Sequence, residues 1–183
     1  MKKKSGNSRQ RTRQTVPLVR GPLNCKAKGD LAELAFLHKA ASLGFGVAKP
    51  YGDNEHYDFI LDSGERFWRV QVRSTSYFEA NRSGYKVHAA HNGRGSKLET
   101  YQAQEIDFFV AYIVPLGIWY IIPVNQLASL CFLRLYPSGC KWGGCFEPFR
   151  EAWHLMAPGA DLPQPRTPRH GRSTNLHHKR FVK

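Results

Sequence analysis

The stretch FFVAYIVPLGIWYIIPV, residues 108–124, constrains the fold of this chain more than any other segment. Its length and apolar character would suit a membrane-spanning helix, but Pro115 and Gly117 stand at its centre. Proline removes a helical hydrogen bond and glycine weakens a helix, so a continuous span is not expected. The run instead predicts two buried strands, at 107–114 and 118–122, joined by a tight turn.

A helix is expected before these strands. The segment KGDLAELAFLHKAASLGFG, residues 28–46, has Asp30 near its start, Gly44 at its end and a dense Leu/Ala pattern between them. A hairpin is expected over 57–75, with Ser63-Gly64 at its turn. The other expected elements are a strand at 45–50, a polar loop at 76–104 with a candidate short strand at 85–91, a short helix at 125–130, a strand at 132–137 and an amphipathic helix at 147–156. This order predicts an α/β (α+β) layer fold with a mixed central sheet flanked by helices.

The positive charge of the chain is concentrated at its two ends. The formal net charge is +13, yet residues 1–28 carry nine Lys/Arg and no Asp/Glu, and residues 158–183 carry six Lys/Arg and one Asp. Subtracting +9 and +5 leaves residues 29–157 at −1. We therefore expect a basic flexible N-terminal arm at 1–27, a folded domain at 28–157 and a basic flexible C-terminal tail at 158–183.

Two interpretations of the basic ends remain open. A one-signed cluster of this density creates a long-range field, which favours arms that hold DNA phosphates without sequence preference. Alternatively, both ends are solvated tails that only aid solubility. The candidate DNA-contacting residues of the N-terminal arm are Lys2, Lys3, Lys4, Arg9, Arg11 and Arg13.

The second strand of the expected hairpin, RVQVRST at 69–75, places an unusual set of polar side chains on one face. Because strand residues alternate between faces, Arg69, Gln71 and Arg73 point one way and the two valines between them point the other way. An ordinary core strand would not need two guanidinium groups and an amide in a row. The pattern therefore favours a functional role for this face.

The hairpin register extends the polar face to the preceding strand. With Asp62 and Glu65 on either side of a two-residue turn, Asp58 lies opposite Arg69 and shares the face of the three polar residues. The other face is apolar, as a core layer requires, and carries Phe59, Leu61, Trp68, Val70 and Val72.

Glu33 adds a second carboxylate to the predicted site. On a helical wheel it falls between Leu37 and Ala40, on the side with Leu34 and Ala41 that we expect to face the core. A carboxylate in such a place usually needs a cation or a hydrogen-bond donor as partner. An edge position, with the carboxylate reaching solvent, would also explain it.

Together, Glu33, Asp58, Gln71 and Arg73 suit a divalent-metal phosphodiesterase. Carboxylate and amide oxygens are the hard ligands that Mg²⁺ prefers. A bound Mg²⁺ activates a water molecule and neutralises charge on the scissile phosphate. The guanidinium of Arg73 would stabilise the transition state or orient the attacking water.

These residues resemble the motif of the PD-(D/E)XK nuclease fold, and more closely that of the group I intron-associated PD-(D/E)XK endonucleases. The likeness rests on a helix glutamate, then YD at a strand start (57–58), then QVR on the next strand (71–73). It covers roughly residues 28–157. The resemblance implies a restriction-endonuclease-like fold in which Asp58 is the motif aspartate and Gln71 stands where most members have Asp or Glu.

The resemblance also implies the remaining ligands and the partners. The backbone carbonyl of Val72 would ligate the metal, and Glu33 would be the extra helix carboxylate. The implied cofactor is Mg²⁺, with Mn²⁺ able to substitute. The implied partner is double-stranded DNA, bound by a homo-oligomer that is a dimer or higher.

Two positions depart from the motif. Tyr57 replaces the motif proline, which mainly shapes the strand start. Arg73 replaces the motif lysine, and a guanidinium stays protonated and cannot act as a general base, although it can hold phosphate through two hydrogen bonds. The sequence predicts a Mg²⁺-dependent DNA endonuclease that makes site-specific double-strand cuts in intron homing. The alternatives are a catalytically weakened or inactive DNA-binding protein on the same fold, and a Holliday-junction-type structure-specific nuclease.

Other segments give weaker signals. The segment HAAHNGRGSK, residues 88–97, contains a His-Asn pair that hints at an HNH-type nuclease, but no His on a following helix is suitably placed. A basic loop that contacts DNA fits better, with an ordinary surface loop as the alternative. Arg69, Arg94 and Lys97 are the candidate DNA contacts outside the arms. Asp107 is expected to start or cap a strand rather than to bind metal.

The cysteines and the N-terminus indicate the compartment. The four cysteines form no C-x-x-C pair, and CKWGGC at 140–145 has a poor spacing for zinc, so reduced thiols are expected. Polar residues rather than an apolar stretch follow MKKK, so no secretory signal is expected. We therefore expect a cytoplasmic protein without a membrane segment.

Overall fold

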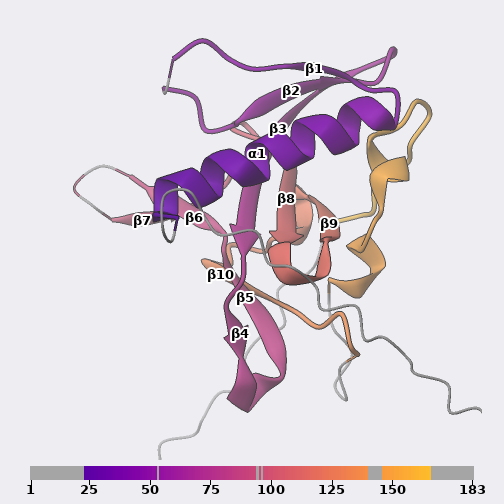
Figure 1. The fold of residues 1–183 in the computed structure, drawn as a ribbon. Helices are drawn as coiled ribbons and strands as arrows, with labels where there is room; N and C mark the ends of the chain where they lie inside the picture. Colours follow the sequence, from indigo (N-terminus) through magenta and orange to yellow (C-terminus); the bar gives the residue numbers. More distant parts are fainter. Residues whose placement is uncertain (1–22, 53, 94, 96, 140–145, 166–183) are drawn as a thin grey trace, which may run out of the picture.

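The computed structural model describes residues 23–52, 54–93, 95, 97–139 and 146–165. The described chain forms a mixed central sheet of five strands with one long helix across it (Figure 1). The central pair β3–β8 is parallel and the other neighbouring pairs are antiparallel. The strands, in spatial order, are β1 (Gly46–Ala48), β2 (Phe59–Asp62), β3 (Phe67–Thr75), β8 (Phe108–Ile113) and β9 (Ile118–Pro123).

The apolar run at 108–124 forms the two buried strands that the sequence predicts. A 3-10 turn at Val114–Leu116 joins β8 to β9, and Gly117 follows it with φ +67°. That left-handed backbone conformation favours glycine. Nearly all side chains of the two strands are buried, because other elements cover both faces of this part of the sheet. Among the described residues, no helix has the length and apolar character needed to cross a membrane.

The β2–β3 hairpin has the predicted faces but not the predicted turn. Asp62 pairs with Phe67, so four residues rather than two form the turn, and the register is shifted by two. Ser63 stabilises this turn, because its backbone N–H donates to the carbonyl of Arg66 at 3.0 Å. A shift of two residues leaves every side chain on its face, since strands have a period of two. Asp58 therefore keeps the predicted face although the expected pairing with Arg69 is wrong.

Helix α1 (Cys25–Ser42) packs on the apolar face of the sheet. Asn24 caps its start by accepting a hydrogen bond from the Ala27 N–H at 2.8 Å, so the helix begins before the predicted Lys28. Phe36 is fully buried, with its ring centroid 5.2 Å from that of Phe59. Phe36 also contacts Trp119 and Trp153.

The predicted buried side of α1 is partly wrong. The buried residues are Ala32, Phe36 and Ala40, whereas Leu34 and Leu37 are 61% and 42% exposed. Small alanines let the helix approach the sheet closely around the single large side chain of Phe36. Gly44, with φ +90°, follows the last turn as predicted.

The segment 76–104, predicted as a polar loop with a candidate short strand at 85–91, contains four strands, two of which overlap that candidate. Two of them join the predicted strand at 132–137 in a second sheet, which lies beyond one end of the central sheet (Figure 1). The other two pair as a short hairpin. The strands are β4 (Phe78–Glu79), β5 (Gly84–His88) and β10 (Phe132–Leu135) in the second sheet, and β6 (Ala90–Asn92) and β7 (Leu98–Thr100) in the hairpin; a 3-10 turn at Ala80–Arg82 joins β4 to β5.

The C-terminal part contains short 3-10 turns in place of the two predicted helices. The segment 125–130 has a 3-10 turn at Val124–Gln126, and 147–156 has two, at Glu147–Phe149 and Trp153–Met156. Glu151 interrupts the second segment with φ +49°, which ends any continuous helix. Side chains of this part, including Trp153 and Met156, still join the core, so the predicted packing role holds although the helix does not form.

The segment that follows residue 157 also packs on the folded part. The Gly159 N–H donates to the Glu65 carboxylate at 3.0 Å, and the Gln126 amide donates to the carbonyl of Gln164 at 2.6 Å. Leu162 packs against the core. Residues 159–164 therefore contact the folded part, while the domain boundary at 157 stays a prediction.

Candidate active site

Asp58 lies immediately before β2 and is held by the neighbouring strand. Its backbone N–H donates to the carbonyl of Val70 at 2.9 Å. Its Oδ2 atom accepts two hydrogen bonds, from the Val72 N–H at 2.8 Å and from Gln71 Nε2 at 2.7 Å. Burial raises the pKa of Asp58 above its ordinary value, while the hydrogen bond from Val72 opposes this rise. These hydrogen bonds fix the Asp58 carboxylate against β3, just before β2 begins.

Gln71 is the buried member of the polar face, with 3% of its surface exposed. Its Nε2 atom lies 2.7 Å from Asp58 Oδ2 and 3.3 Å from the carbonyl oxygen of Val72. Turning this amide by half a turn would bring Oε1 to the same place, so that three oxygens would converge. Three converging oxygens repel one another unless a cation lies among them. The donor set therefore fits a divalent cation with oxygen ligands.

Glu33 reaches this region from α1 and is paired with a lysine that sequence analysis did not predict. Its carboxylate is 23% exposed and lies 2.7 Å from Nζ of Lys49, just after β1. The hydrogen bond from this lysine to Glu33 raises the pKa of Lys49. The charge of Glu33 also contributes to the raised pKa of Asp58, after burial. The two carboxylates therefore share one electrostatic field, with Lys49 as the cation in it.

Arg73 follows along β3 and is exposed, as a contact with substrate requires. Its Nη2 atom donates to the hydroxyl of Tyr101 at 2.9 Å. Tyr101 is 4% exposed, and burial raises the pKa of its hydroxyl, so this group stays protonated and neutral. Tyr101 is a second residue of the site that sequence analysis did not predict. It holds one side of the guanidinium and leaves the rest open.

A groove runs along α1 and the end of β3, beside Asp58 and Gln71, which are not among its lining residues. It has a volume of about 630 Å³, and Glu33, Val72 and Arg73 are among its lining residues. Arg73 also borders a neighbouring hollow of about 390 Å³. That hollow is lined further by Lys86 and His88, which adds basic side chains beside the groove. The site is therefore open to a large polyanion.

The geometry gives Arg69 a structural role. Its guanidinium contacts Asp107 through Nη2 at 3.0 Å and Nε at 3.1 Å, and it also donates to the backbone carbonyls of Ala103 and Gln104. The backbone N–H of Arg69 also donates to Asp107 Oδ2 at 2.8 Å. Asp107 thus fixes the start of β8, as predicted. Because the donors of Arg69 serve these contacts, we do not count Arg69 among the proposed DNA contacts.

Of the remaining residues predicted to contact DNA, only Lys97 lies among the residues that the structure describes. Lys97 is exposed just before β7, and its carbonyl accepts from the Gly93 N–H at 2.8 Å. The other predicted contacts, namely Lys2, Lys3, Lys4, Arg9, Arg11, Arg13 and Arg94, lie outside the described residues. The predicted ligands Glu33, Asp58, Gln71 and Val72 all lie in one region with Arg73.

Comparisons with known proteins show the family and the fold of the chain. The family model of the PD-(D/E)XK endonucleases matches residues 23–138. Among solved structures, the chain is similar to a bacterial homing endonuclease, I-Ssp6803I, with 31% sequence identity and a TM-score of 0.62. The similarity covers 72% of this chain and 92% of that chain. A search of curated proteins found no match.

Proposed function

Because the chain belongs to the PD-(D/E)XK endonuclease family, as the sequence predicts, we propose that it is a Mg²⁺-dependent nuclease making site-specific double-strand cuts in DNA. Members of this family hydrolyse phosphodiester bonds and generally depend on a divalent metal. The proposed specificity and the homing role draw on the likeness to I-Ssp6803I. The observation that carries the proposal is the convergence of Asp58 Oδ2, the Gln71 amide and the Val72 carbonyl at 2.7–3.3 Å.

The proposed cofactor is Mg²⁺, with Mn²⁺ able to replace it. Asp58, Oε1 of Gln71, the carbonyl of Val72 and the Glu33 carboxylate would hold the ion. When bound, the ion would supply an activated water and neutralise charge on the phosphate. Oxygen ligands alone favour Mg²⁺ or Mn²⁺ over metals that prefer imidazole or thiolate.

The protein groups around this site position the substrate and stabilise charge. The Val72 N–H fixes the Asp58 carboxylate through a 2.8 Å hydrogen bond, so Asp58 does not need to reorganise during the reaction. Tyr101 holds the guanidinium of Arg73 on one side. The remaining donors of Arg73 are then free to hold the phosphate through two hydrogen bonds.

The test is cleavage of supercoiled plasmid carrying the target region, with Mg²⁺ and with Mn²⁺, by the wild type and by Asp58→Ala. Asp62→Ala is a matched control, because Asp62 lies on the same strand and caps the turn through Gly64. We expect Asp58→Ala to abolish cleavage and to leave DNA binding intact, while Asp62→Ala cuts normally. Equal cleavage by Asp58→Ala and wild type would refute the site. Binding without cleavage by the wild type would favour the inactive DNA-binding alternative.

We further propose that the basic ends and the Arg94–Lys97 loop hold DNA phosphates. Residues 1–22 and 166–183 carry thirteen Lys/Arg and no Asp/Glu. Deleting both ends should lower non-specific affinity and flatten its dependence on salt, because fewer counterions are released on binding. The C-terminal deletion must begin after residue 165, since residues 163 and 164 accept hydrogen bonds from Gln126. An unchanged salt slope would show that the ends do not contact DNA.

The proposed assembly is a homo-oligomer, a dimer or higher. A single hydrolytic site cuts one strand, so a double-strand cut at one locus takes two sites. Sedimentation of the full chain with and without target DNA tests this proposal. A protein that remains monomeric on DNA while cutting both strands would contradict it.

A further inference from the structure

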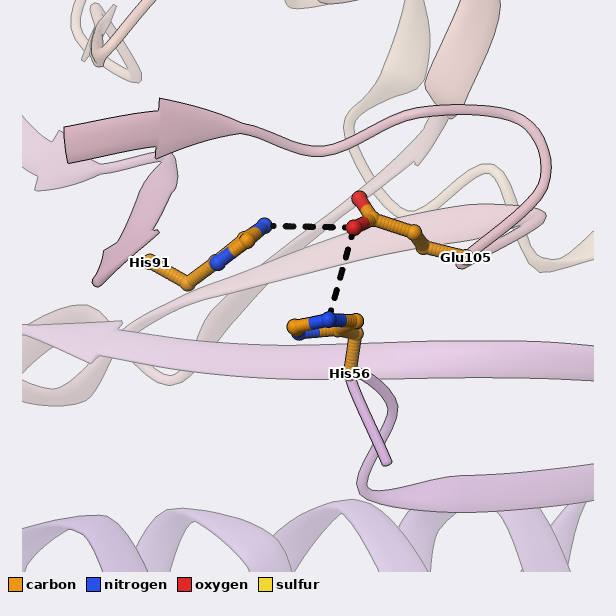
Figure 2. Close-up of side chains that lie close together, drawn as sticks. All are labelled: His56, His91 and Glu105. Carbon is orange, nitrogen blue, oxygen red and sulfur yellow. Dashed lines mark ion pairs between the residues drawn. The ribbon is translucent and has the colours of Figure 1, made fainter. Parts of the chain in front are cut away.

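Two histidines and a glutamate from three separate segments meet beside the proposed active site (Figure 2). His56 precedes β2, His91 lies in β6, and Glu105 lies in the segment before β8. Nε2 of each histidine is 3.4 Å from the same oxygen, Oε1 of Glu105. The ligand atoms of all three residues lie within 4.8 Å of one another.

His91 is the buried member of this cluster. Its side chain is 10% exposed, and neither of its ring nitrogens has a hydrogen-bond partner among the described residues. Nε2 forms an ion-pair contact with Glu105 at 3.4 Å that lacks the alignment of a hydrogen bond. Buried polar atoms are nearly always satisfied, so Nε2, which faces the Glu105 carboxylate, points to a partner that is not a protein side chain.

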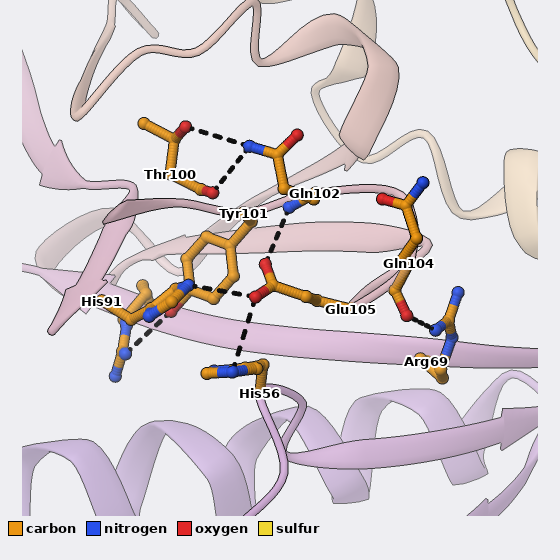
Figure 3. Close-up of polar contacts among 9 residues, drawn as sticks. His56, Arg69, His91, Thr100, Tyr101, Gln102, Gln104 and Glu105 are labelled. Carbon is orange, nitrogen blue, oxygen red and sulfur yellow. Dashed lines mark hydrogen bonds and ion pairs between the residues drawn. The ribbon is translucent and has the colours of Figure 1, made fainter. Parts of the chain in front are cut away.

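The carboxylate of Glu105 is held with one oxygen turned to the histidines (Figure 3). Its Oε2 atom accepts a hydrogen bond from the Gln102 N–H at 2.9 Å. Oε1 is left facing the two imidazole rings, whose centroids are 4.2 Å apart. A backbone donor that orients a carboxylate in this way is a common support for metal ligands.

We propose that Nε2 of His56, Nε2 of His91 and Oε1 of Glu105 bind a transition-metal ion of the Zn²⁺ class. Ligands about 2.0–2.1 Å from a tetrahedral ion lie about 3.3 Å apart, which matches the two 3.4 Å separations. Imidazole nitrogen favours Zn²⁺, Co²⁺ or Ni²⁺ over Mg²⁺. This site is therefore distinct in chemistry from the all-oxygen site at Asp58.

The fourth position of the ion would open toward a cavity. His56 and His91 line a hollow of about 460 Å³ together with Asn92, Gly93 and Glu99. A water molecule has room there, and the carboxylate of Glu99 lies close by. Three protein ligands with an open fourth position is an arrangement that Zn²⁺ accepts.

The ion would connect three segments that support the active site. His56 is two residues from Asp58 in the sequence. The ring of His91 lies 5.0 Å from that of Tyr101, which in turn holds Arg73 through a 2.9 Å hydrogen bond. A bound ion would fix the segment before β2 and the β6–β7 hairpin relative to Asp58 and Arg73. The expected role is structural, with an added gain in stability of the folded chain.

The test is direct binding of Zn²⁺ by calorimetry, and of Co²⁺ by its visible absorption, to the full chain. The variants are His56→Gln and His91→Gln, and His88→Gln is the control because His88 is an exposed histidine on the adjacent strand β5. We expect the first two to weaken Zn²⁺ binding more than tenfold and to lose the four-coordinate Co²⁺ spectrum. His88→Gln should bind like wild type. Histidines of the C-terminal segment are present in every protein compared, so the differences report on the cluster.

Two further measurements make the result decisive. Zn²⁺ should raise the melting temperature of wild type but not of His56→Gln, whose ring is exposed enough to be replaced without loss of folding. Asp58→Ala should keep the Co²⁺ spectrum, because it removes only the oxygen site. Wild-type Zn²⁺ binding in both His56→Gln and His91→Gln would overturn the proposal, whether or not the protein cleaves DNA.

Discussion

Gln71 offers the sharpest test of the converging-oxygen site, through Gln71→Glu. In the wild type, the amide Nε2 donates to Asp58 Oδ2 at 2.7 Å in a nearly closed environment. The substitution replaces this hydrogen bond with a contact between two carboxylates. It also installs the acidic residue that most members of the family carry at this position.

The expected effect on stability depends on the metal: the substitution costs stability without a divalent ion, and bound Mg²⁺ offsets this loss. Losing a hydrogen bond to a charged acceptor costs roughly 1.5–3 kcal/mol. The added buried negative charge beside Asp58 brings the expected loss to about 3 kcal/mol in the absence of divalent metal. With Mg²⁺, the two carboxylates become ligands. Each tenfold gain in affinity over wild type returns about 1.4 kcal/mol at saturating Mg²⁺.

Urea unfolding, followed by tryptophan fluorescence, measures the free energy of unfolding without and with Mg²⁺. The fluorescence reports on unfolding because Trp68, Trp119 and Trp153 are buried in the core. The matched control is Gln126→Glu. Gln126 is 4% exposed and also loses donated hydrogen bonds, to the carbonyls at 163 and 164, but it lies outside the site. Mg²⁺ should stabilise Gln71→Glu more than wild type and should not rescue Gln126→Glu. If Mg²⁺ stabilises the two variants equally, the assignment of Gln71 as a ligand is refuted.

Three further predictions concern the charged groups around this site. At saturating Mg²⁺, Arg73→Ala should raise the activation free energy of cleavage by about 3 kcal/mol, whereas Arg73→Lys should keep substantial activity. Equal cleavage rates for the wild type and both variants would show that Arg73 takes no part in the reaction. Lys49→Ala should slow cleavage at least tenfold at saturating Mg²⁺, and an unchanged rate would place Lys49 outside the reaction. Because burial raises the pKa of Asp58, the folded state binds its proton more tightly than the unfolded state does. Without divalent metal, the free energy of unfolding of the wild type, measured with urea, should therefore fall relative to that of Asp58→Asn as the pH rises from about 3.8 through the raised pKa. If the two free energies change with pH in the same way, the pKa of Asp58 is not raised.

The strands of the central sheet could be predicted from the sequence because they depend on local pattern, whereas most of the short strands in 76–104 were not predicted. The apolar run with Pro115 and Gly117 gave β8, the turn and β9. In the hairpin, the predicted turn was two residues too short, yet the polar and apolar faces were right. A period of two protects the faces from a shift by two residues, and a shift by one would have reversed them.

The contacts between distant segments could not be predicted in the same way. Lys49 meets Glu33 across 16 positions and Tyr101 meets Arg73 across 28, and neither residue stands out in its own segment. The exposed leucines of α1 misled the helical wheel, since composition alone does not show which stripe a helix buries. His91 was noted only as part of a His-Asn pair, and its neighbours His56 and Glu105 come from other elements.

Arg73 and Lys49 are two cationic side chains near the motif position where most members of the family have lysine. A lysine at position 73 would offer a compact ammonium with an adjustable pKa, whereas the guanidinium of Arg73 stays protonated. Lys49 does not replace that adjustable group, because its hydrogen bond to Glu33 raises its pKa further. Neither cation can accept a proton at neutral pH, so under the proposed function both would stabilise charge. Under the proposed function, proton removal from the attacking water would then depend on a divalent ion, which lowers the pKa of a bound water.

This division of roles predicts that Arg73→Lys changes the height of the pH–rate profile and not its shape. The profile would be measured for both proteins on one DNA substrate at saturating Mg²⁺, and again with Mn²⁺. Exchanging the ion should move the acidic limb in both proteins by the same amount, because the group that must lose a proton would be the metal-bound water. A limb that moves on Arg73→Lys at constant metal would show that residue 73 takes part in proton transfer.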